Sequence, residues 1–262
     1  MNNNPVKPKK ILNSFIVPKE INVLISSMGG VGTTFLIEYI KKYRSTNLSM
    51  GEDGFKHLLF PPLSKNHDIK YIYLFGNPID SVISLFRRNF HYAHSIQLLS
   101  FNKYLKAINP ATTLEQYTAE GEDRFLFSEQ FNNWLTGPHF YPTLFLKYEK
   151  LWDNMDTLFD FLDIPRKEIN SFPAKKQRSA DFSSLNKDTQ DSLKKIYGDF
   201  EKYINEFDDC LIVNDRKKRL VPGMFFTKTF YYSFRRNIAI KINDFSPTLS
   251  DYLENLYLSG RK

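Results

Sequence analysis

Hydrophobic positions along the chain fall into alternating strand-like and helix-like segments. Short apolar runs rich in β-branched and aromatic residues predict strands at about 21–26, 55–60, 69–75 and 143–147. Apolar residues at helical spacing predict helices at about 33–43, 79–90, 129–135, 151–162 and 186–207. Residues 91–125 are mixed, with helix in places. Strands that alternate with helices are typical of a parallel sheet covered on both faces, so we expect an α/β fold.

The junction between the first strand and the first helix carries the clearest chemistry. Residues 21–40 read INVLISSMGGVGTTFLIEYI, an apolar run, a glycine-rich turn and an amphipathic run. Glycines let the backbone approach a bulky anion, and the N–H groups of a helix's first turn can bind it. The sequence therefore predicts a phosphate-binding loop made of Gly29, Gly30, Val31, Gly32, Thr33, Thr34 and Phe35.

This loop matches neither of two common nucleotide-binding patterns. A Walker A loop requires Gly-Lys-Ser/Thr, and Thr33 stands where the lysine should be. The glycine spacing also differs from that of the dinucleotide-binding fingerprint. A tight turn between strand and helix, with no ligand, remains the alternative reading.

A second turn of interest follows the predicted strand 69–75. It reads Gly76-Asn77-Pro78-Ile79-Asp80, with Pro78 at or near the first helical position. Asp80 adds negative charge to the first helical turn, where we expect it to cap the helix. Ligands of parallel sheets lie beyond the carboxyl ends of the strands. We therefore expect both turns to belong to one site.

Length and composition set the limits of the interpretation. The 262 residues suffice for one large domain or one domain with an appendage. We expect a polar lead-in (1–18), an α/β domain (19–209) and an aromatic, basic C-terminal extension (210–262) packed on the domain. The formal charge of +7 favours anionic partners without choosing among them. With Cys210 as the single cysteine, an intrachain disulfide and a cysteine-based metal site are excluded, and we expect no metal.

Targeting signals are weak in this sequence. The first 15 residues lack a long apolar stretch, and no apolar run approaches the length of a membrane span. We therefore expect a cytoplasmic protein without a nucleic-acid partner. Residues 225–242 mix aromatic and basic side chains. They could pack on the domain, form dimer contacts or touch a membrane surface, and the oligomeric state is left open.

Several segments, in the same order, resemble the PAPS-dependent sulfotransferases. Residues 29–35 resemble the family's 5′-phosphosulfate loop, Pro-Lys-Ser-Gly-Thr-Thr-Trp, and residues 56–58 resemble the segment with its catalytic histidine. Residues 71–84 resemble its 3′-phosphate element, Arg-Asn-Pro-x-Asp-x-x-x-Ser. Residues 147–151 and 161–165 resemble its Tyr-Glu-Asp-Leu and Phe-Leu-Gly-Ile-Pro elements, and residues 183–185 with the following helix resemble the C-terminal module of many bacterial-type members.

The resemblance implies a P-loop-type three-layer α/β fold, with a mostly parallel central sheet flanked by helices. It also implies transfer of a sulfuryl group from PAPS to a hydroxyl or amine acceptor, with PAP as product and no metal. Thr33, Thr34 and the loop amides would hold the 5′-phosphosulfate, and His57 would be the general base. The rival histidines are His67, His91 and His94.

The departures from the family pattern concern its two phosphate-binding cations. The loop lysine falls on Gly30, and the arginine that holds the 3′-phosphate falls on Gly76. Ser84 keeps its place as a 3′-phosphate ligand. Substitute cations are available in the sequence at Lys56, Arg87, Arg88, Lys175, Lys176 and Arg178. The last three form the cluster that the resemblance places over the 3′-phosphate.

Two other functions remain open because both cations are missing. One is a catalytically impaired relative that binds a nucleotide or a glycan. The other is an ATP-dependent P-loop kinase, against which Thr33 and the absence of an obvious Walker B aspartate argue. Outside the site, we expect Glu149 to pair with a basic group, and Phe131 and Trp134 to lie in the core.

Overall fold

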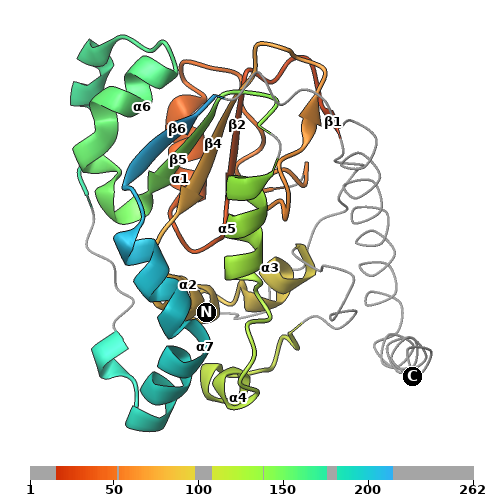
Figure 1. The fold of residues 1–262 in the computed structure, drawn as a ribbon, viewed down its shortest axis with the longest axis vertical. Helices are drawn as coiled ribbons and strands as arrows, with labels where there is room; N and C mark the ends of the chain where they lie inside the picture. Colours follow the sequence, from red (N-terminus) through yellow and green to blue (C-terminus); the bar gives the residue numbers. More distant parts are fainter. Residues whose placement is uncertain (1–15, 52, 98–107, 138, 176–181, 215–262) are drawn as a thin grey trace.

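A four-stranded sheet forms the centre of the computed structural model (Figure 1). The structure describes residues 16–51, 53–97, 108–137, 139–175 and 182–214. The strand order is β2 (Val23–Ser27), β4 (Lys70–Phe75), β5 (Thr143–Lys147) and β6 (Cys210–Val213). The first three strands are parallel, and β6 runs antiparallel to β5. This arrangement confirms the expected α/β fold with a mostly parallel sheet.

Helices cover both faces of the sheet, because the strand residues alternate between two apolar faces. Tyr71 and Tyr73 contact Trp134 of helix α5 (Phe127–Thr136), and Phe75 contacts Phe131 of the same helix. Phe131 and Trp134 have no exposed surface, which confirms them as core residues. Helices α1 (Thr33–Ile40) and α6 (Met155–Phe161) lie together on the face opposite α5 (Figure 1).

The other helices surround the carboxyl edge of the sheet. They are α2 (Pro78–Arg87), α3 (His91–Gln97), α4 (Leu114–Ala119) and the long α7 (Lys187–Glu206), which packs against α2 and α4. Short 3-10 turns occur at Tyr148–Lys150, Trp152–Asn154, Arg166–Ser171 and Phe182–Ser184. A small parallel sheet pairs β1 (Ile16–Val17) with β3 (Leu63–Ser64). Every predicted helix is present, with ends shifted by a few residues.

One predicted strand is wrong. Residues 55–60 form turns and irregular backbone rather than a strand. Their polar backbone groups bond outside any strand ladder: the Leu58 amide donates to Ser26 Oγ at 3.1 Å, and its carbonyl accepts from Trp134 Nε1 at 2.8 Å. Phe55, Leu58 and Leu59 of this segment are buried without joining the sheet, whereas Phe60 is half-buried.

Three described strands were not predicted: the two-residue strands β1 and β3, and β6 at the edge of the main sheet. Residues 210–213, the first of the expected extension, form the edge strand β6 and pair with β5. Four residues after a helix give little periodic signal, and only the pairing partner makes them a strand. The rest of the predicted extension, 215–262, lies outside the described residues, as does most of the predicted lead-in, 1–15.

A buried polar cluster ties the turn before α5 to α4 and α7. Asp123 accepts from the Tyr197 hydroxyl at 2.9 Å and from the Phe127 amide at 2.9 Å. Tyr197 also bonds the Tyr117 hydroxyl. Burial raises the pKa of the Asp123 carboxyl to about 6, although these hydrogen bonds act in the opposite direction.

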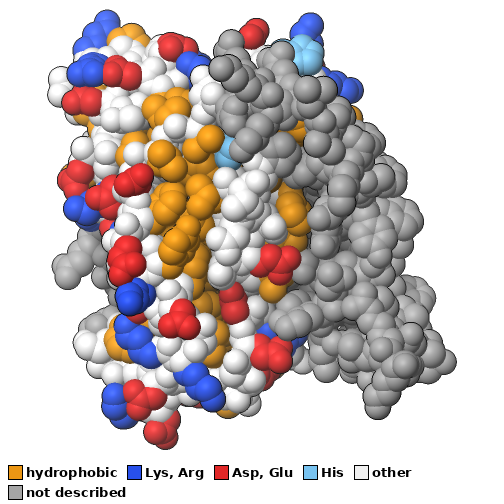
Figure 2. Space-filling model, in the orientation of Figure 1, with side chains coloured by type: hydrophobic (Ala, Val, Ile, Leu, Met, Phe, Trp, Pro, Cys, Tyr) orange, Lys and Arg blue, Asp and Glu red, His pale blue; other side chains and the backbone are white. Residues whose placement is uncertain are grey.

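The described surface carries charges of both signs. In Figure 2, acidic and basic side chains are interspersed over α6 and α7, and a band of hydrophobic side chains runs beside them. Within the described residues, no helix has the length and apolar character needed to cross a membrane.

Candidate functional site

The carboxyl ends of β2, β4 and β5 bring three turns into contact. A Cβ atom added at Gly30, after β2, would lie 2.7 Å from the Cα of Ser81 in α2. A Cβ atom added at Gly76, after β4, would lie 2.9 Å from both carboxylate oxygens of Glu149, after β5. We call the β2–α1 turn (28–33) with residues 56–57 the first corner, and the β4–α2 turn (76–77) with Glu149 the second corner.

The first corner offers an anion-binding helix end. Gly30 and Gly32 have φ angles of 70° and 72°, in the left-handed region that favours glycine. Gly32 precedes the first helical residue, Thr33, and within the described residues no side chain caps the helix. The first turn of α1 therefore directs amide groups and the positive end of the helix dipole toward the loop.

Thr33 and His57 are joined through Ser27. The Ser27 hydroxyl lies 2.6 Å from Thr33 Oγ1 and 3.1 Å from His57 Nδ1. His57 Nδ1 also lies 3.0 Å from the Ser27 carbonyl oxygen. A carbonyl can only accept, so we infer that Nδ1 carries the proton and that Nε2 is the basic nitrogen. The structure thus brings the predicted base and the predicted phosphate loop together.

The turn that carries His57 is fixed from two sides. The Ser27 amide donates to the Lys56 carbonyl at 2.9 Å. Gln130 Nε2, from α5, donates to the Ser27 carbonyl at 3.1 Å and to the Leu58 carbonyl at 2.8 Å. Gln130 is fully buried, and sequence reasoning missed it. The sequence feature that could have identified Gln130 is its position as a polar residue on an otherwise apolar helix face.

Of the rival histidines, His94 adjoins the base. Its ring meets the His57 ring edge to face, with the centroids 4.5 Å apart. A Cβ atom added at Gly29 would lie 2.3 Å from His94 Cε1, so the same imidazole also lies against the loop. Sequence reasoning named His94 only as an alternative base, because residues 91–125 gave a mixed pattern that did not place its side chain.

The two remaining histidines lie elsewhere. His91 stacks on Phe86 at 4.4 Å, its Nε2 lies 3.2 Å from the Pro110 carbonyl, and burial lowers its pKa. His67 is exposed and precedes β4, at the opposite edge of the sheet from the glycine loop.

Lys56 contacts the N-terminal turn of α1 directly. Its Nζ donates to Thr34 Oγ1 at 2.5 Å and to the Ser49 carbonyl at 2.7 Å. The sequence pointed to Lys56 only as a neighbour of His57. Phe35, the last loop residue, packs against Trp152 and Phe172 with centroid distances of 6.3 and 5.3 Å.

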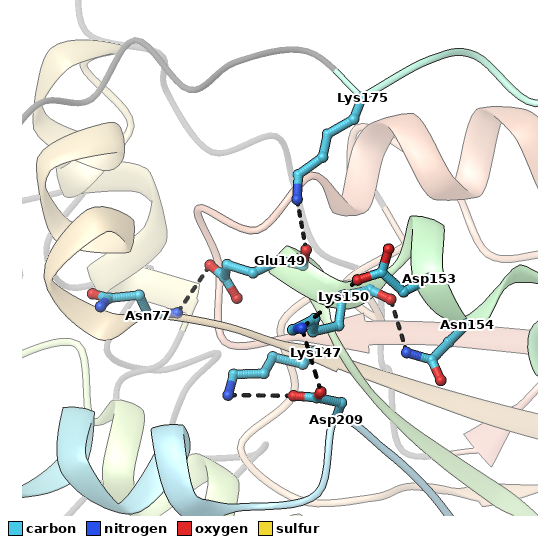
Figure 3. Close-up of polar contacts among 8 residues, drawn as sticks. All are labelled: Asn77, Lys147, Glu149, Lys150, Asp153, Asn154, Lys175 and Asp209. Atoms are coloured by element: carbon cyan, nitrogen blue, oxygen red, sulfur yellow. Dashed lines mark hydrogen bonds and ion pairs between the residues drawn. The ribbon is translucent and has the colours of Figure 1, made fainter.

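The second corner is organised by Asn77. Its side chain accepts from the Asp80 amide at 3.1 Å, so Asn77 rather than Asp80 caps α2. Its own amide donates to Glu149 Oε1 at 3.2 Å, and its Nδ2 donates to Glu201 Oε1 at 2.8 Å. The Glu149 carbonyl accepts from Lys175 Nζ at 2.7 Å (Figure 3). The Glu149 carboxylate thus lies where the resemblance places an arginine, and the Glu201 carboxylate binds the neighbouring Asn77 side chain.

The predicted 3′-phosphate ligands are only partly brought together. Ser84 is half-buried on α2, one turn beyond the Ser81 that touches Gly30. Arg87 is exposed at the far end of α2 from the second corner. Lys175 is exposed and reaches the second corner through Glu149. Lys176 and Arg178 lie outside the described residues.

A comparison with protein-family models identifies the family of this chain. A model of the sulfotransferase domain matches residues 55–214, which is more than half of the chain. The matched region contains Lys56, His57 and the second corner, whereas the glycine loop precedes it. A search of curated proteins found no match. The chain therefore belongs to the sulfotransferase domain family.

Proposed function

We propose that the protein transfers a sulfuryl group from PAPS to a hydroxyl or amine acceptor. The observation that supports this is the link from His57 through Ser27 to Thr33. It holds an imidazole with a basic Nε2 beside an anion-binding helix end. Group transfer needs this combination, because the attacking oxygen must lose a proton while negative charge grows on the leaving oxygen.

The residues of the first corner fit a 5′-phosphosulfate. Gly29, Gly30 and Gly32 lie so close to other segments that any side chain on them would collide with a neighbour. These contacts fix the loop in front of α1, and an anion would bind the α1 amides together with the Thr33 and Thr34 hydroxyls. When bound, PAPS would supply the activated sulfuryl group.

His57 acts on the acceptor. The acceptor oxygen forms a bond to sulfur while the bond from sulfur to the bridging oxygen breaks, and the acceptor proton passes to His57 Nε2. The Ser27 carbonyl at Nδ1 orients the ring and stabilises the imidazolium that forms. Donors at the start of α1 stabilise the charge left on the bridging oxygen, which becomes part of PAP.

The second corner supports an alternative, a catalytically impaired nucleotide- or glycan-binding relative. Gly76 replaces the family's arginine, and the Glu149 carboxylate occupies the space beside it. Ser84 and the cluster of Lys175, Lys176 and Arg178 would then have to hold the 3′-phosphate. Replacing the three basic residues together should weaken PAP binding, and unchanged affinity would exclude their role.

The decisive experiment compares the melting temperatures of the protein with PAP, ATP and adenosine, followed by PAPS turnover with a broad acceptor panel. Ligand at a hundredfold excess over its dissociation constant stabilises the folded state by about 2.7 kcal/mol. We expect a selective shift with PAP together with turnover. Binding without turnover would favour the impaired relative, and tighter, magnesium-dependent binding of ATP would favour a kinase.

A further inference from the structure

One carbonyl oxygen connects His57 to helix α5. The Ser27 carbonyl accepts from His57 Nδ1 at 3.0 Å and from Gln130 Nε2 at 3.1 Å. A carbonyl oxygen has two lone pairs, so these two contacts can use both of them. Gln130 has no exposed surface, and its Nε2 also donates to the Leu58 carbonyl at 2.8 Å. Gln130 therefore ties the end of β2 to the residue that follows His57.

The orientation of the Gln130 amide follows from its partners. Both partners of Nε2 are carbonyl oxygens, which only accept, so the NH₂ group faces them and Oε1 does not. Within the described part of the chain, the buried Oε1 has no hydrogen-bond partner. A buried polar atom without a partner is unfavourable. The two donated hydrogen bonds are therefore what favours an amide at this buried position.

The side chain of Ser27 offers His57 a competing partner. Its hydroxyl lies 3.1 Å from Nδ1, almost as near as the carbonyl oxygen. If the carbonyl is the partner, Nδ1 carries the proton and Nε2 has the lone pair. If the hydroxyl donates instead, Nδ1 has the lone pair and Nε2 carries the proton, so Nε2 cannot take a proton from an acceptor. The choice between two atoms of one residue therefore decides whether His57 can act as a base at Nε2.

We propose that Gln130 is a positioning residue that selects the Nδ1–H tautomer of His57. By donating to the Ser27 and Leu58 carbonyls, it fixes the distance between the end of β2 and the turn that carries His57. The Ser27 carbonyl then faces Nδ1, and the hydroxyl is the weaker partner. The effect of Gln130 on catalysis rests on the proposed function, whereas its effect on the tautomer can be measured without any substrate.

The test compares Gln130→Met with Trp134→Phe. The methionine variant removes both donors but leaves each of the two carbonyls one partner. The phenylalanine variant removes the other donor to the Leu58 carbonyl and leaves the Ser27 contact intact. Long-range proton–nitrogen spectra of protein with ¹⁵N-labelled histidine report the tautomer at about pH 8.5, where imidazoles of ordinary pKa are neutral. The His57 signals are those that His57→Gln removes.

We expect the Nδ1–H form of His57 to predominate in the unmodified protein and in Trp134→Phe. In Gln130→Met, the ratio of Nδ1–H to Nε2–H should fall by about three- to tenfold, which is the effect of one hydrogen bond. The kcat for PAPS should fall in proportion to the lost Nδ1–H fraction, while KM for PAPS stays within about twofold. Adding Ser27→Ala to Gln130→Met removes the competing hydroxyl, so the Nδ1–H form should return.

The possible outcomes separate this proposal from the proposed function. An unchanged tautomer in Gln130→Met, an equal shift in Trp134→Phe, or no return in the double variant overturns the role of Gln130. A predominant Nε2–H form of His57 in the unmodified protein overturns that role together with the assignment of the base. The expected tautomer shifts without PAPS turnover by the unmodified protein keep the role of Gln130 and overturn sulfuryl transfer. If Gln130→Met does not fold, Gln130→Leu, which also lacks a donor, takes its place.

Discussion

Both corners of the site have a glycine where the resemblance implies a cation, but the surroundings of the two glycines differ. In the first corner Gly30 stands where the resemblance places a lysine, and Lys56 places an ammonium at the start of α1. In the second corner Gly76 stands where the resemblance places an arginine, and the atoms nearest to a Cβ added there are the carboxylate oxygens of Glu149. A glycine at a position where the resemblance implies a cation therefore says little until the neighbours of that glycine are known.

The physical reason is the difference in surroundings. The first corner lies at the start of a helix, next to a turn whose backbone is fixed by Ser26, Ser27 and Gln130. The second corner is a capped helix start, where Asn77 already satisfies the Asp80 amide and Glu149 accepts the Asn77 amide. We infer that the first corner supplies the chemistry, whereas the second supplies at most affinity.

The largest expected effect is on turnover in the first corner. Replacing His57 with glutamine keeps a donor for the Ser27 carbonyl but removes the base. Turnover of PAPS should fall by about 10²–10⁴-fold while PAP affinity stays within about twofold. The matched variant at the predicted 3′-phosphate ligand on α2, Ser84→Ala, should weaken PAP binding more than turnover. If the two substitutions lowered PAP affinity and PAPS turnover equally, the proposed division of roles between the two parts of the site would be wrong.

Substitution by alanine at Gly30 and at Gly76 should lower the free energy of unfolding by different amounts. Gly30→Ala places a Cβ atom in the left-handed region and against the Ser81 backbone, so it should cost roughly 3 kcal/mol of unfolding free energy. Gly76→Ala meets the end of the Glu149 side chain and a Val31 methyl group, which can shift, so it should cost about 1 kcal/mol. Urea unfolding measures both, and a larger cost at Gly76 would contradict the comparison.

Outside both corners, Asp123 should make stability depend on pH. Its folded-state pKa is about 6, raised from 3.8 by burial, so the folded state binds the proton more tightly than the unfolded chain. Stability from this group is present below pH 4 and is lost as pH rises through about 6, by roughly 2–3 kcal/mol at most. Asp123→Asn should remove this slope in urea unfolding between pH 4 and 6. A slope unchanged by the substitution would show that other groups cause it.

The smallest expected effect concerns the cap of the second corner. Asn77→Ala removes the hydrogen bond to the Asp80 amide and the contact with Glu201, and should cost about 1 kcal/mol of stability. Asn77→Ser can still cap the helix and should recover most of that loss in thermal unfolding. Because the first corner is built without Asn77, His57-dependent turnover should persist in both variants. Loss of turnover in the serine variant would mean that the corners are coupled.

Local patterns were sufficient for most elements of the fold. The strand before Gly29, the buried strand 70–75 and the long helix 187–206 follow from apolar periodicity, and the two turns follow from glycine and proline. The strand β6 and the irregular path of residues 55–60 did not follow from it. Their conformation depends on hydrogen bonds to partners distant in the sequence, such as Trp134 for residue 58.

The sequence by itself determined which residue types are available: a glycine loop before a helix, a histidine that can act as a base, and two missing cations. The tertiary structure alone decided how they combine. It joined His57 to Thr33 through Ser27, placed Lys56 at the N-terminal turn of α1 and put Glu149 against Gly76. The reason is that each of these contacts spans two or three separate turns. Parallel pairing of β2, β4 and β5 brings the turns after these strands to one edge of the sheet, and hydrogen bonds from Ser27 and Gln130 hold residues 56–58 there.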